Sequence, residues 1–464
     1  MVQSTGTRPA HERVIPRPHI SVLRILEMNL GFLGLQFSFG LQQGNMSPIY
    51  SYLGANEAAL PILTLAGPMT GLIVQPIIGA LSDKTKSRWG RRTPYFIFGA
   101  ILCSLGLFFM PLSSSILMAA SLLWILDAGN NITMEPYRAY VSDRLEPEQR
   151  QLGFLTQSAF TGLAQMLAFL SPSFMVYVLG MNMNTIDSHN IPYVTRYAFM
   201  IGAFLSVTTI LWSIIRVPEL PLTPQEEAAI DAKPKGFLPV FKEIWQAILE
   251  MPIAMRKLAV MSLFQWYAMA AYWAYVVYSI GRSVFSTSDA VSDGFRSAVL
   301  ANGEMAAFYN GLGFVLAFAM VPLAKRFGAH RIHAFCLILA GIGMFSLPFA
   351  SEKWMLFLPA IGIGIGWASI MGNPYIILAN AIPPDRTGVY MGIFNMMIVI
   401  PMLLLAATLP FYYESLLGGD ARNVLRLCGV CMFCAAAAVW WVKTEVATAD
   451  GAAMSGEDRS PKIS

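Results

Sequence analysis

Charged residues are scarce in this chain. Asp, Glu, Lys and Arg supply 12% of its 464 residues, whereas soluble domains carry about 25%. Hydrophobic residues supply 56%, so the chain cannot cover itself with a polar surface, and an ordinary soluble globular protein is excluded. The composition indicates a protein of the lipid bilayer. We interpret the formal net charge of +4 as a signal of how the chain is oriented in the membrane, and we infer no nucleic-acid partner from it.

Cysteine and histidine are also few. Every cysteine lies in an apolar segment, and the series Cys428, Cys431 and Cys434 has no histidine near it, unlike a zinc site. The histidines lie in terminal regions, loops or helix ends: His11, His19, His189, His330 and His333. We therefore predict packing roles for the thiols, no metal ion, no cofactor and no histidine relay for protons inside the membrane.

Long apolar runs are abundant instead. A membrane-spanning helix needs about 20 apolar residues, and twelve segments qualify: 21–43, 60–82, 94–113, 116–140, 153–179, 195–216, 254–281, 303–325, 331–350, 354–380, 388–413 and 424–443. The first segment lacks the small-residue cleavage site of a signal peptide. We therefore expect it to remain as the first helix.

Basic residues are unevenly divided between the loops. The loops 44–59 and 114–115 have no Lys or Arg, whereas basic residues crowd two others: Lys84, Lys86, Arg88, Arg91 and Arg92 in one, and Lys233, Lys235, Lys242, Arg256 and Lys257 in the central one. Since cytoplasmic loops carry the excess of positive charge, both termini are predicted to be cytoplasmic.

The predicted organisation has five parts. Residues 1–20 form a cytoplasmic segment, 21–216 a bundle of six helices, 217–253 a cytoplasmic connector, 254–443 a second bundle and 444–464 a disordered tail. The connector is rich in proline and polar residues, and residues 237–252 have the spacing of a helix that lies on the membrane surface.

The two bundles share a sequence pattern. Arg88 and Gly90 follow the second span as Arg326 and Gly328 follow the eighth, and residues 135–137 (Glu-Pro-Tyr) correspond to residues 373–375 (Asn-Pro-Tyr). Such duplication is typical of transporters whose halves enclose a site near the middle of the membrane. The sequence therefore predicts an all-α membrane protein with twelve spans in two six-helix pseudo-repeats.

Asp127 is the only acidic residue near the middle of the apolar stretch 122–140. A charge in lipid costs about 2.5–3.5 kcal/mol or more, so such a residue is read first as a substrate or proton site. Asn130, Asn131 and Arg138 lie on nearly the same helical face. Burial disfavours the charged carboxyl and a cation favours it, so a change in a pairing between Asp127 and Arg138 would couple protonation to conformation.

Other interpretations of these charges remain open. Asp127 could form a static buried pair or a packing hydrogen bond, and Arg138 could be an anchor at the cytoplasmic end of its helix. Glu27 and Glu304 lie near helix ends, where they could reach the membrane interface. Either could otherwise serve as the coupling acid.

A polar substrate would need hydrogen-bonding partners and an apolar face, which amides and aromatic rings supply. Amides could equally join helices to one another, and aromatic rings could face lipid. The substrate-binding candidates are spread over several spans: Gln36, Gln42, Gln43, Asn45, Asn130, Asn131, Gln265, Trp266, Asn373 and Asn395.

Residues 79–96, GALSDKTKSRWGRRTPYF, are the most specific string in the chain. They resemble the loop signature of major facilitator transporters, in the variant of the sucrose transporters and the glycoside/pentoside/hexuronide symporters. The residues that match are Gly79, Asp83, Arg88, Gly90, Arg91 and Arg92. They are expected to govern conformational change at the cytoplasmic side.

Further stretches narrow this resemblance. Residues 34–54, 67–83, 124–143 and 388–401 are similar to the bacterial branch of the sucrose/α-glucoside proton symporter family. The resemblance implies the major facilitator fold and proton-coupled uptake of a disaccharide or α-glucoside, of the sucrose or maltose type, by alternating access. It implies Asp127 and Arg138 as coupling residues, a bacterial inner membrane and, we expect, a monomer.

Competing functions lack their expected features. Sodium coupling in related symporters needs acids clustered on the second and fourth helices, and residues 60–82 contain none. An exporter would share the loop signature but not the other strings. A membrane enzyme would need a cluster of His, Asp or Glu at one face, and a receptor a large soluble extension. Residues 50–57 lack the histidine of plant family members, so plant-like selectivity is not expected.

Overall fold

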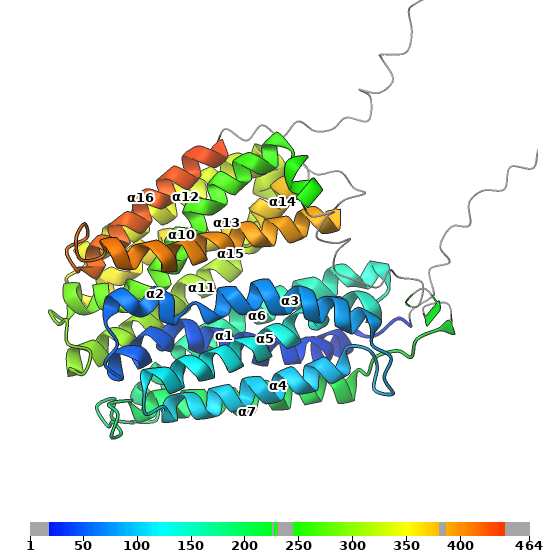
Figure 1. Cartoon of the computed structure of the whole chain (residues 1–464), viewed down its shortest axis with the longest axis horizontal. Coiled ribbons are helices and arrows are strands. Elements are labelled where there is room, and N and C mark those ends of the chain that lie inside the picture. Colours follow the sequence, from blue (N-terminus) through cyan, green and yellow to red (C-terminus); the bar gives the residue numbers. More distant parts are fainter. Residues whose placement is uncertain (1–17, 225–226, 229, 231–244, 380–386, 441–464) are drawn as a thin grey trace, which may run out of the picture.

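The computed structural model describes residues 18–440 except 225–226, 229, 231–244 and 380–386, and its regular structure in that part of the chain is helical (Figure 1). The first group of long helices comprises α1 (Val22–Tyr52), α2 (Leu60–Leu63), α3 (Ala66–Lys84), α4 (Thr93–Phe109), α5 (Ile116–Arg144), α6 (Pro147–Tyr177) and α7 (Tyr193–Arg216). The second comprises α10 (Ile253–Val284), α11 (Asp293–Phe327), α12 (Ala329–Ser346), α13 (Phe357–Ile370), α14 (Asn373–Ala379), α15 (Thr387–Tyr412) and α16 (Ala421–Trp440). Short 3₁₀ turns connect some of them: η1 (Glu57–Ala59), η2 (Met110–Leu112), η3 (Leu347–Phe349) and η4 (Lys353–Leu356).

Two predicted spans are each broken into two helices. The segment 60–82 is divided at Thr64–Leu65 and the segment 354–380 at Met371–Gly372. A proline follows each break, Pro68 and Pro374. Because proline has no backbone N–H, it cannot bond the carbonyl four residues earlier, which is that of Thr64 or Ile370.

The helix α1 runs to Tyr52, well past the predicted end at residue 43. The stretch 44–52 has a glycine, an asparagine and a proline, which are loop signals. Its side chains are nonetheless buried, so tertiary packing overrides the local preference. The polar residues inside α1 reach protein and not lipid.

The two bundles repeat the same packing (Figure 1). In the first bundle α1 packs on α6 and α7, and α5 packs on α3 and α4; in the second α10 packs on α15 and α16, and α13 packs on α11 and α12. The bundles meet through α6 with α11 and α3 with α15. The repeated loop glycines, Gly90 and Gly328, both have positive φ, 105° and 87°. The two pseudo-repeats predicted from the sequence are confirmed.

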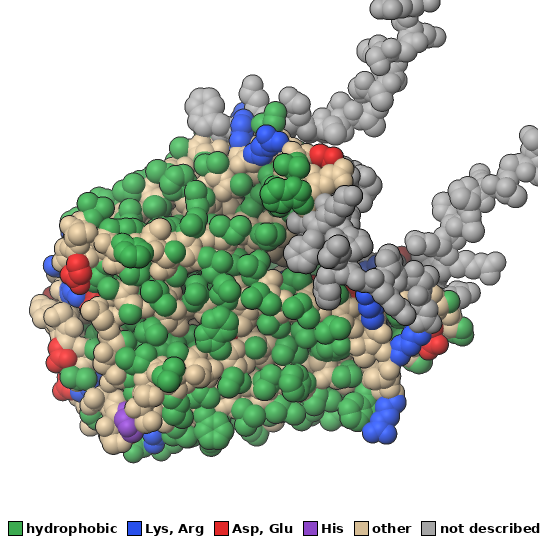
Figure 2. Space-filling view, in the orientation of Figure 1, with side chains coloured by type: hydrophobic (Ala, Val, Ile, Leu, Met, Phe, Trp, Pro, Cys, Tyr) green, Lys and Arg blue, Asp and Glu red, His purple; other side chains and the backbone are tan. Residues whose placement is uncertain are grey.

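The outer surface fits a bilayer. Ten helical segments of the described residues are long and apolar enough to cross a membrane, and apolar side chains cover the middle of the face in Figure 2, with charges gathered near its two ends. The helices α1 and α10 are not among these ten. The α1 helix buries polar residues such as Gln36 and Gln42, which lowers its mean hydropathy. The number of twelve spans stays a prediction.

Some predictions fall outside the described residues. These are the segment 1–17, the tail 444–464, the charges Lys233, Lys235 and Lys242, residues 237–244 of the proposed surface helix 237–252, and the loop from residue 380 to residue 386. The described part of that proposed helix is helical at residues 245–249.

Candidate functional site

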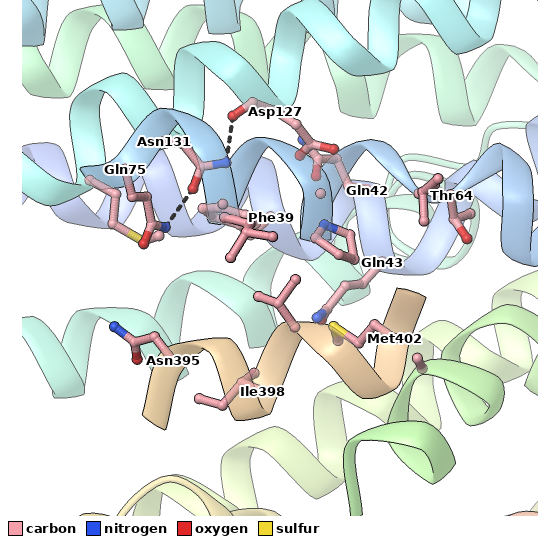
Figure 3. A pocket seen from close by; sticks show the side chains of 18 of the residues that line it. Phe39, Gln42, Gln43, Thr64, Gln75, Asp127, Asn131, Asn395, Ile398 and Met402 are labelled. Atoms are coloured by element: carbon pink, nitrogen blue, oxygen red, sulfur yellow. Dashed lines mark hydrogen bonds between the residues drawn. The ribbon is translucent and has the colours of Figure 1, made fainter. Parts of the chain in front are cut away.

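A cavity of about 750 Å³ lies between the two bundles. The helices α1, α3 and α5 form one wall, and α10 and α15 form the wall opposite (Figure 3). The polar or charged side chains that line it are Gln42, Gln43, Ser47, Thr64, Gln75, Asp127, Asn131, Glu135, Arg138 and Asn395. All but one of these belong to the first bundle.

The second bundle supplies a mainly apolar wall. Its lining residues on α10 and α15 are Ala270, Trp273, Ala274, Gly392, Asn395, Met396, Ile398, Val399, Met402 and Leu405. Tyr375 of α14 also lines the cavity. The cavity therefore offers hydrogen bonds on one side and apolar contact on the other, which is what a polar ring with an exposed C–H face requires.

Asp127 lies deep in this cavity on α5, with only 2% of its surface exposed. Among the described residues, its Oδ1 atom has no hydrogen-bond partner and no salt bridge joins it to a cation. A buried carboxylate without a partner is costly. The position therefore suits a group that exchanges a proton or binds a polar ligand.

Asn131 is fixed by three hydrogen bonds. Its Nδ2 atom donates to the Asp127 carbonyl at 2.8 Å and to Thr70 Oγ1 at 2.9 Å. Its Oδ1 atom accepts from Gln75 Nε2 at 2.6 Å (Figure 3). This network joins α3 to α5 beside the cavity. Gln75 was not predicted, although it is the only amide in the apolar segment 60–82.

The predicted substrate-binding residues divide into two groups. Gln42, Gln43, Asn131 and Asn395 line the cavity together with Asp127. The others make contacts within the bundles and do not line it: Gln36 accepts from Gln165, Asn45 bonds the Leu41 carbonyl, Asn130 bonds Ser38 and Cys103, Gln265 bonds His333, Asn373 bonds Ser369, and Trp266 packs near Trp273. For this second group the contacts are those of helix packing.

The expected pairing of Asp127 with Arg138 is wrong for this conformation. Both line the cavity, but α5 is continuous between them, so eleven residues place them about 16 Å apart along its axis. Arg138 instead lies 3.8 Å from Glu135. The shared helical face was correctly predicted, but the three turns that separate the residues prevent contact.

His333 lies near the start of α12, at a helix end as the sequence indicated. It is fully buried, and its ring lies 2.9 Å from Gln265 Oε1 and 2.8 Å from Ser369 Oγ. It therefore joins α10, α12 and α13 inside the second bundle. It does not line the cavity.

The two bundles are hydrogen-bonded to one another at the end of the molecule that holds Glu57. Arg282 Nη2 lies 2.8 Å from Glu57 Oε1, and the Tyr413 hydroxyl donates to Glu57 Oε2 at 2.5 Å. Tyr278 bonds both Ser47 and Ser51. We call this the Glu57 end, and these contacts close it.

The cavity opens toward the opposite end, which holds Arg91 and Arg92 and which we call the basic end. Asp127 is 2% exposed, whereas the Glu135 and Arg138 side chains are 39% and 49% exposed. Exposure thus increases along α5 toward the basic end. Solvent and small solutes can reach the cavity from that side.

The two alternative acids both have partners. Glu27 lies at the basic end and pairs with Arg24 at 3.1 Å and Arg216 at 2.9 Å. Glu304 pairs with Lys353 at 2.8 Å and accepts from Ser173 across the two bundles. Neither lines the cavity, so Asp127 differs from both in its location and its lack of a countercharge.

The loop motif forms an ion-pair network at the basic end. Arg92 lies 2.6 Å from Asp83 and 3.0 Å from Asp143, and Arg91 lies 2.5 Å from Asp143. Burial alone would lower the pKa of Arg92, but the two carboxylates raise it above its usual value. Gly79 lines the cavity, Gly90 makes the turn, and Arg88 lies over the Trp89 ring.

Glu219 completes this network and was not predicted. Its carboxylate accepts hydrogen bonds from the backbone N–H groups of Arg91, Arg92 and Thr93, and from Thr93 Oγ1 at 2.6 Å. It therefore satisfies free donors at the start of α4 from outside that helix. The only signal in the sequence is an acid three residues after the last span of the first bundle.

Comparison with known proteins agrees with this architecture. The Major Facilitator Superfamily model matches residues 28–406. Sucrose transport protein SUC4 of Arabidopsis thaliana is 24% identical over 457 residues, covering 89% of this chain and 88% of that protein. The General alpha-glucoside permease of Schizosaccharomyces pombe is 24% identical over 282 residues, covering 57% and 49%.

A solved structure shows the same fold. A mutant of the nucleoside transporter NupG superposes with a TM-score of 0.67 at 14% identity, over 90% of this chain and 99% of that chain. These relatives are transporters and not enzymes, and they support the resemblance that the sequence motifs indicated. With two repeated helical bundles around a central cavity and a family model that matches most of its length, the chain belongs to the Major Facilitator Superfamily.

Proposed function

We propose that the chain is a proton-coupled symporter that imports a disaccharide or an α-glucoside, of the sucrose or maltose type, by alternating access. The observation that carries the proposal is Asp127, a buried carboxyl group without a countercharge in the cavity between the two bundles. In lipid-embedded proteins such residues belong to substrate or proton pathways.

The choice of a sugar has two supports. Relatives of similar length are named sucrose transport proteins, and a further relative is named an alpha-glucoside permease. The cavity sets the amides Gln42, Gln75 and Asn131 opposite an apolar wall. Amides can pair with hydroxyl groups as both donor and acceptor.

The orientation follows from the charges. The basic end should face the cytoplasm, because basic loops stay on that side. The helix α1 begins at the same end, since the backbone of Ile20, just before it, is bonded to Gln149 at the start of α6. In this proposal the conformation is inward-open, and the protein works as a monomer in a bacterial inner membrane.

The transport cycle depends on the proton at Asp127. On the outside, a protonated Asp127 is neutral, and the sugar binds to the amides beside it. The bundles then rock about the fixed site, the contacts at the Glu57 end form, and the cavity opens at the basic end. Loss of the proton leaves a charge that attracts water into the cavity, and the sugar is released.

Arg138 acts from a distance in this proposal. It lies at the mouth of the cavity beside Glu135, three turns from Asp127. There its charge favours the departure of a proton toward the cytoplasm and does not hold Asp127 directly. Alternative coupling by sodium, or export of another solute, is distinguished by the experiment below.

The test is uptake of radiolabelled sucrose and maltose into proteoliposomes under an imposed pH gradient, with wild type, Asp127→Asn and the matched variant Glu304→Gln. We expect wild type and Glu304→Gln to accumulate sugar and to lose it when a protonophore is added. Asp127→Asn should exchange sugar without accumulating it.

Four outcomes would contradict the proposal. Accumulation that survives in Asp127→Asn would place the coupling elsewhere. Accumulation driven only by a sodium gradient would show that sodium, and not the proton, is the coupling ion. Transport confined to the outward direction would indicate an exporter, and the absence of any sugar exchange by folded protein would overturn the substrate class.

A further inference from the structure

The face of α3 toward the cavity has two adjacent rows of residues, each with a four-residue spacing, and one row is Pro68, Leu72 and Pro76. The other row is mostly glycine. Gly67, Gly71, Gln75 and Gly79 all line the cavity, and this spacing keeps them on one side of an α-helix. Three of the four positions have no side chain. Along this row the helix presents mostly bare backbone to the cavity, beside the apolar side chains of the other row.

Each glycine lies beside one polar residue of α5. A Cβ atom added at Gly67 would lie 3.5 Å from Asp127 Oδ2, one at Gly71 would lie 3.9 Å from Asn131 Oδ1, and one at Gly79 would lie 3.4 Å from Glu135 Cγ. The α5 residues follow the same four-residue spacing. The missing side chains on α3 thus leave a column of polar groups on α5 open to the cavity.

Two polar groups near the first glycine have no partner. Asp127 Oδ1 and Gln42 Nε2 make no hydrogen bond with any described residue, although both side chains are more than nine-tenths buried. Both line the cavity (Figure 3). An acceptor and a donor left unpaired in a buried cavity are what a ligand hydroxyl group would satisfy.

The next group lies one helical turn away. Asn131 follows Asp127 by four residues on α5, which is about 6 Å along the helix axis, and Gln75 of α3 bonds Asn131. That distance is close to the length of one hexose ring. The cavity wall therefore has two neighbouring groups of hydrogen-bonding side chains, and each group lies beside one glycine.

We propose that Gly67 and Gly71 are specificity-determining residues that open two consecutive hexose subsites, the first at Asp127 and Gln42 and the second at Asn131 and Gln75. The substrate is then a glycoside of two linked rings that lies along α3. This inference rests on the proposed function, because it names the subsites of the same transport site.

The experiment compares Gly67→Ala and Gly71→Ala with the control Gly372→Ala, which lies outside the cavity and whose added Cβ would meet only the Ala368 carbonyl at 4.0 Å. Gly67 and Gly71 lie within α3, where alanine favours the helix more than glycine does. Gly372 lies at the break between α13 and α14 and does not have a positive φ. The added atoms meet only ordinary contacts, so all three variants should fold. The probes are labelled maltose and sucrose, with two rings, and methyl α-D-glucoside, with one.

We expect Gly71→Ala to raise the KM of the two-ring sugar about tenfold, the ratio that corresponds to about 1.4 kcal/mol, and to leave that of methyl α-D-glucoside within about twofold. Gly67→Ala should raise the KM of both kinds of sugar, whereas Gly372→Ala should raise the KM of neither. Thermal unfolding in detergent checks that the variants are folded.

Two results would overturn the subsites. One is an equal effect of Gly71→Ala on both kinds of sugar, or no effect on either. The other is a wild-type protein that takes up the two-ring sugar but is neither inhibited by methyl α-D-glucoside nor able to transport it. A wild-type protein that transports none of these sugars would instead contradict the proposed function.

Discussion

Arg282 of α10 binds Glu57, which follows α1 in the other bundle, with Nη2 and Oε1 2.8 Å apart. Both side chains are mostly shielded, with exposed fractions of 16% and 17%. Tyr275 and Tyr413 bond the same glutamate, one at its backbone carbonyl and one at its carboxylate. A single residue of the first bundle thus holds three side chains of the second, and this contact must break when the Glu57 end opens.

Glu57→Gln should shift the protein toward the conformation that is open at the Glu57 end. A hydrogen bond between charged groups contributes about 1.5–3 kcal/mol, so the population ratio should change about tenfold or more. The measurement is the rate at which a membrane-impermeant thiol reagent, added on that side, labels a cysteine introduced at Gln43. The matched control is Glu352→Gln, an exposed carboxylate at the same end, which should leave the rate unchanged. Equal labelling of Glu57→Gln and wild type would show that this pair does not close the cavity.

Glu219→Gln should lower the stability of the basic end. The carboxylate accepts four hydrogen bonds from the first residues of α4 and the preceding loop, and loss of a helix cap costs about 0.5–2 kcal/mol. We expect a lower midpoint of thermal unfolding in detergent and slower transport. Glu148→Gln, on the exposed first turn of α6, should change neither. If Glu219→Gln unfolds as wild type does, the cap contributes nothing measurable.

Gln75→Ala should change the KM for sugar and not the stability, whereas Gln36→Ala should change the stability and not the KM. Gln75 lines the cavity and holds Asn131, so its loss should raise the KM for sugar about fivefold, which corresponds to about 1 kcal/mol, with little change in stability. Gln36 joins α1 to α6 through Gln165, so its loss should lower the unfolding midpoint and leave KM unchanged. Uptake kinetics and thermal unfolding of both variants provide the comparison. The same effect from both variants would remove the distinction between lining and packing amides.

His333→Leu should destabilise the second bundle without changing proton coupling. The substitution leaves Gln265 and Ser369 without the imidazole that bonds them, and a buried polar group that loses its partner costs about 1–3 kcal/mol. His333→Gln can restore part of the bonding and should unfold at an intermediate temperature. Uptake driven by a pH gradient is measured on the folded fraction of each variant. Loss of accumulation in a variant as stable as wild type would instead identify His333 as part of a proton pathway.

The sequence by itself determined the class of fold. Lipid requires long apolar helices with internally bonded backbones, and a local average of hydropathy detects them, so each of the twelve predicted segments corresponds to a helix or a broken helix. The repeat was visible because Gly90 and Gly328 occupy the same turn in both halves. Asp127 was conspicuous for the same reason, since one acid in an apolar stretch needs no tertiary information to be noticed.

Only the tertiary structure decided which residues share the site. Helical periodicity gives the angle between two residues of one helix, but neither which face meets the cavity nor which residue of another helix lies opposite. Asn130 and Asn131 are adjacent in the sequence, yet one bonds Ser38 inside the bundle and the other lines the cavity. The glycines of α3 acquire meaning only through the α5 residues beside them. Contacts such as Glu57 with Arg282 join residues more than two hundred positions apart, and packing between whole helices brings them together.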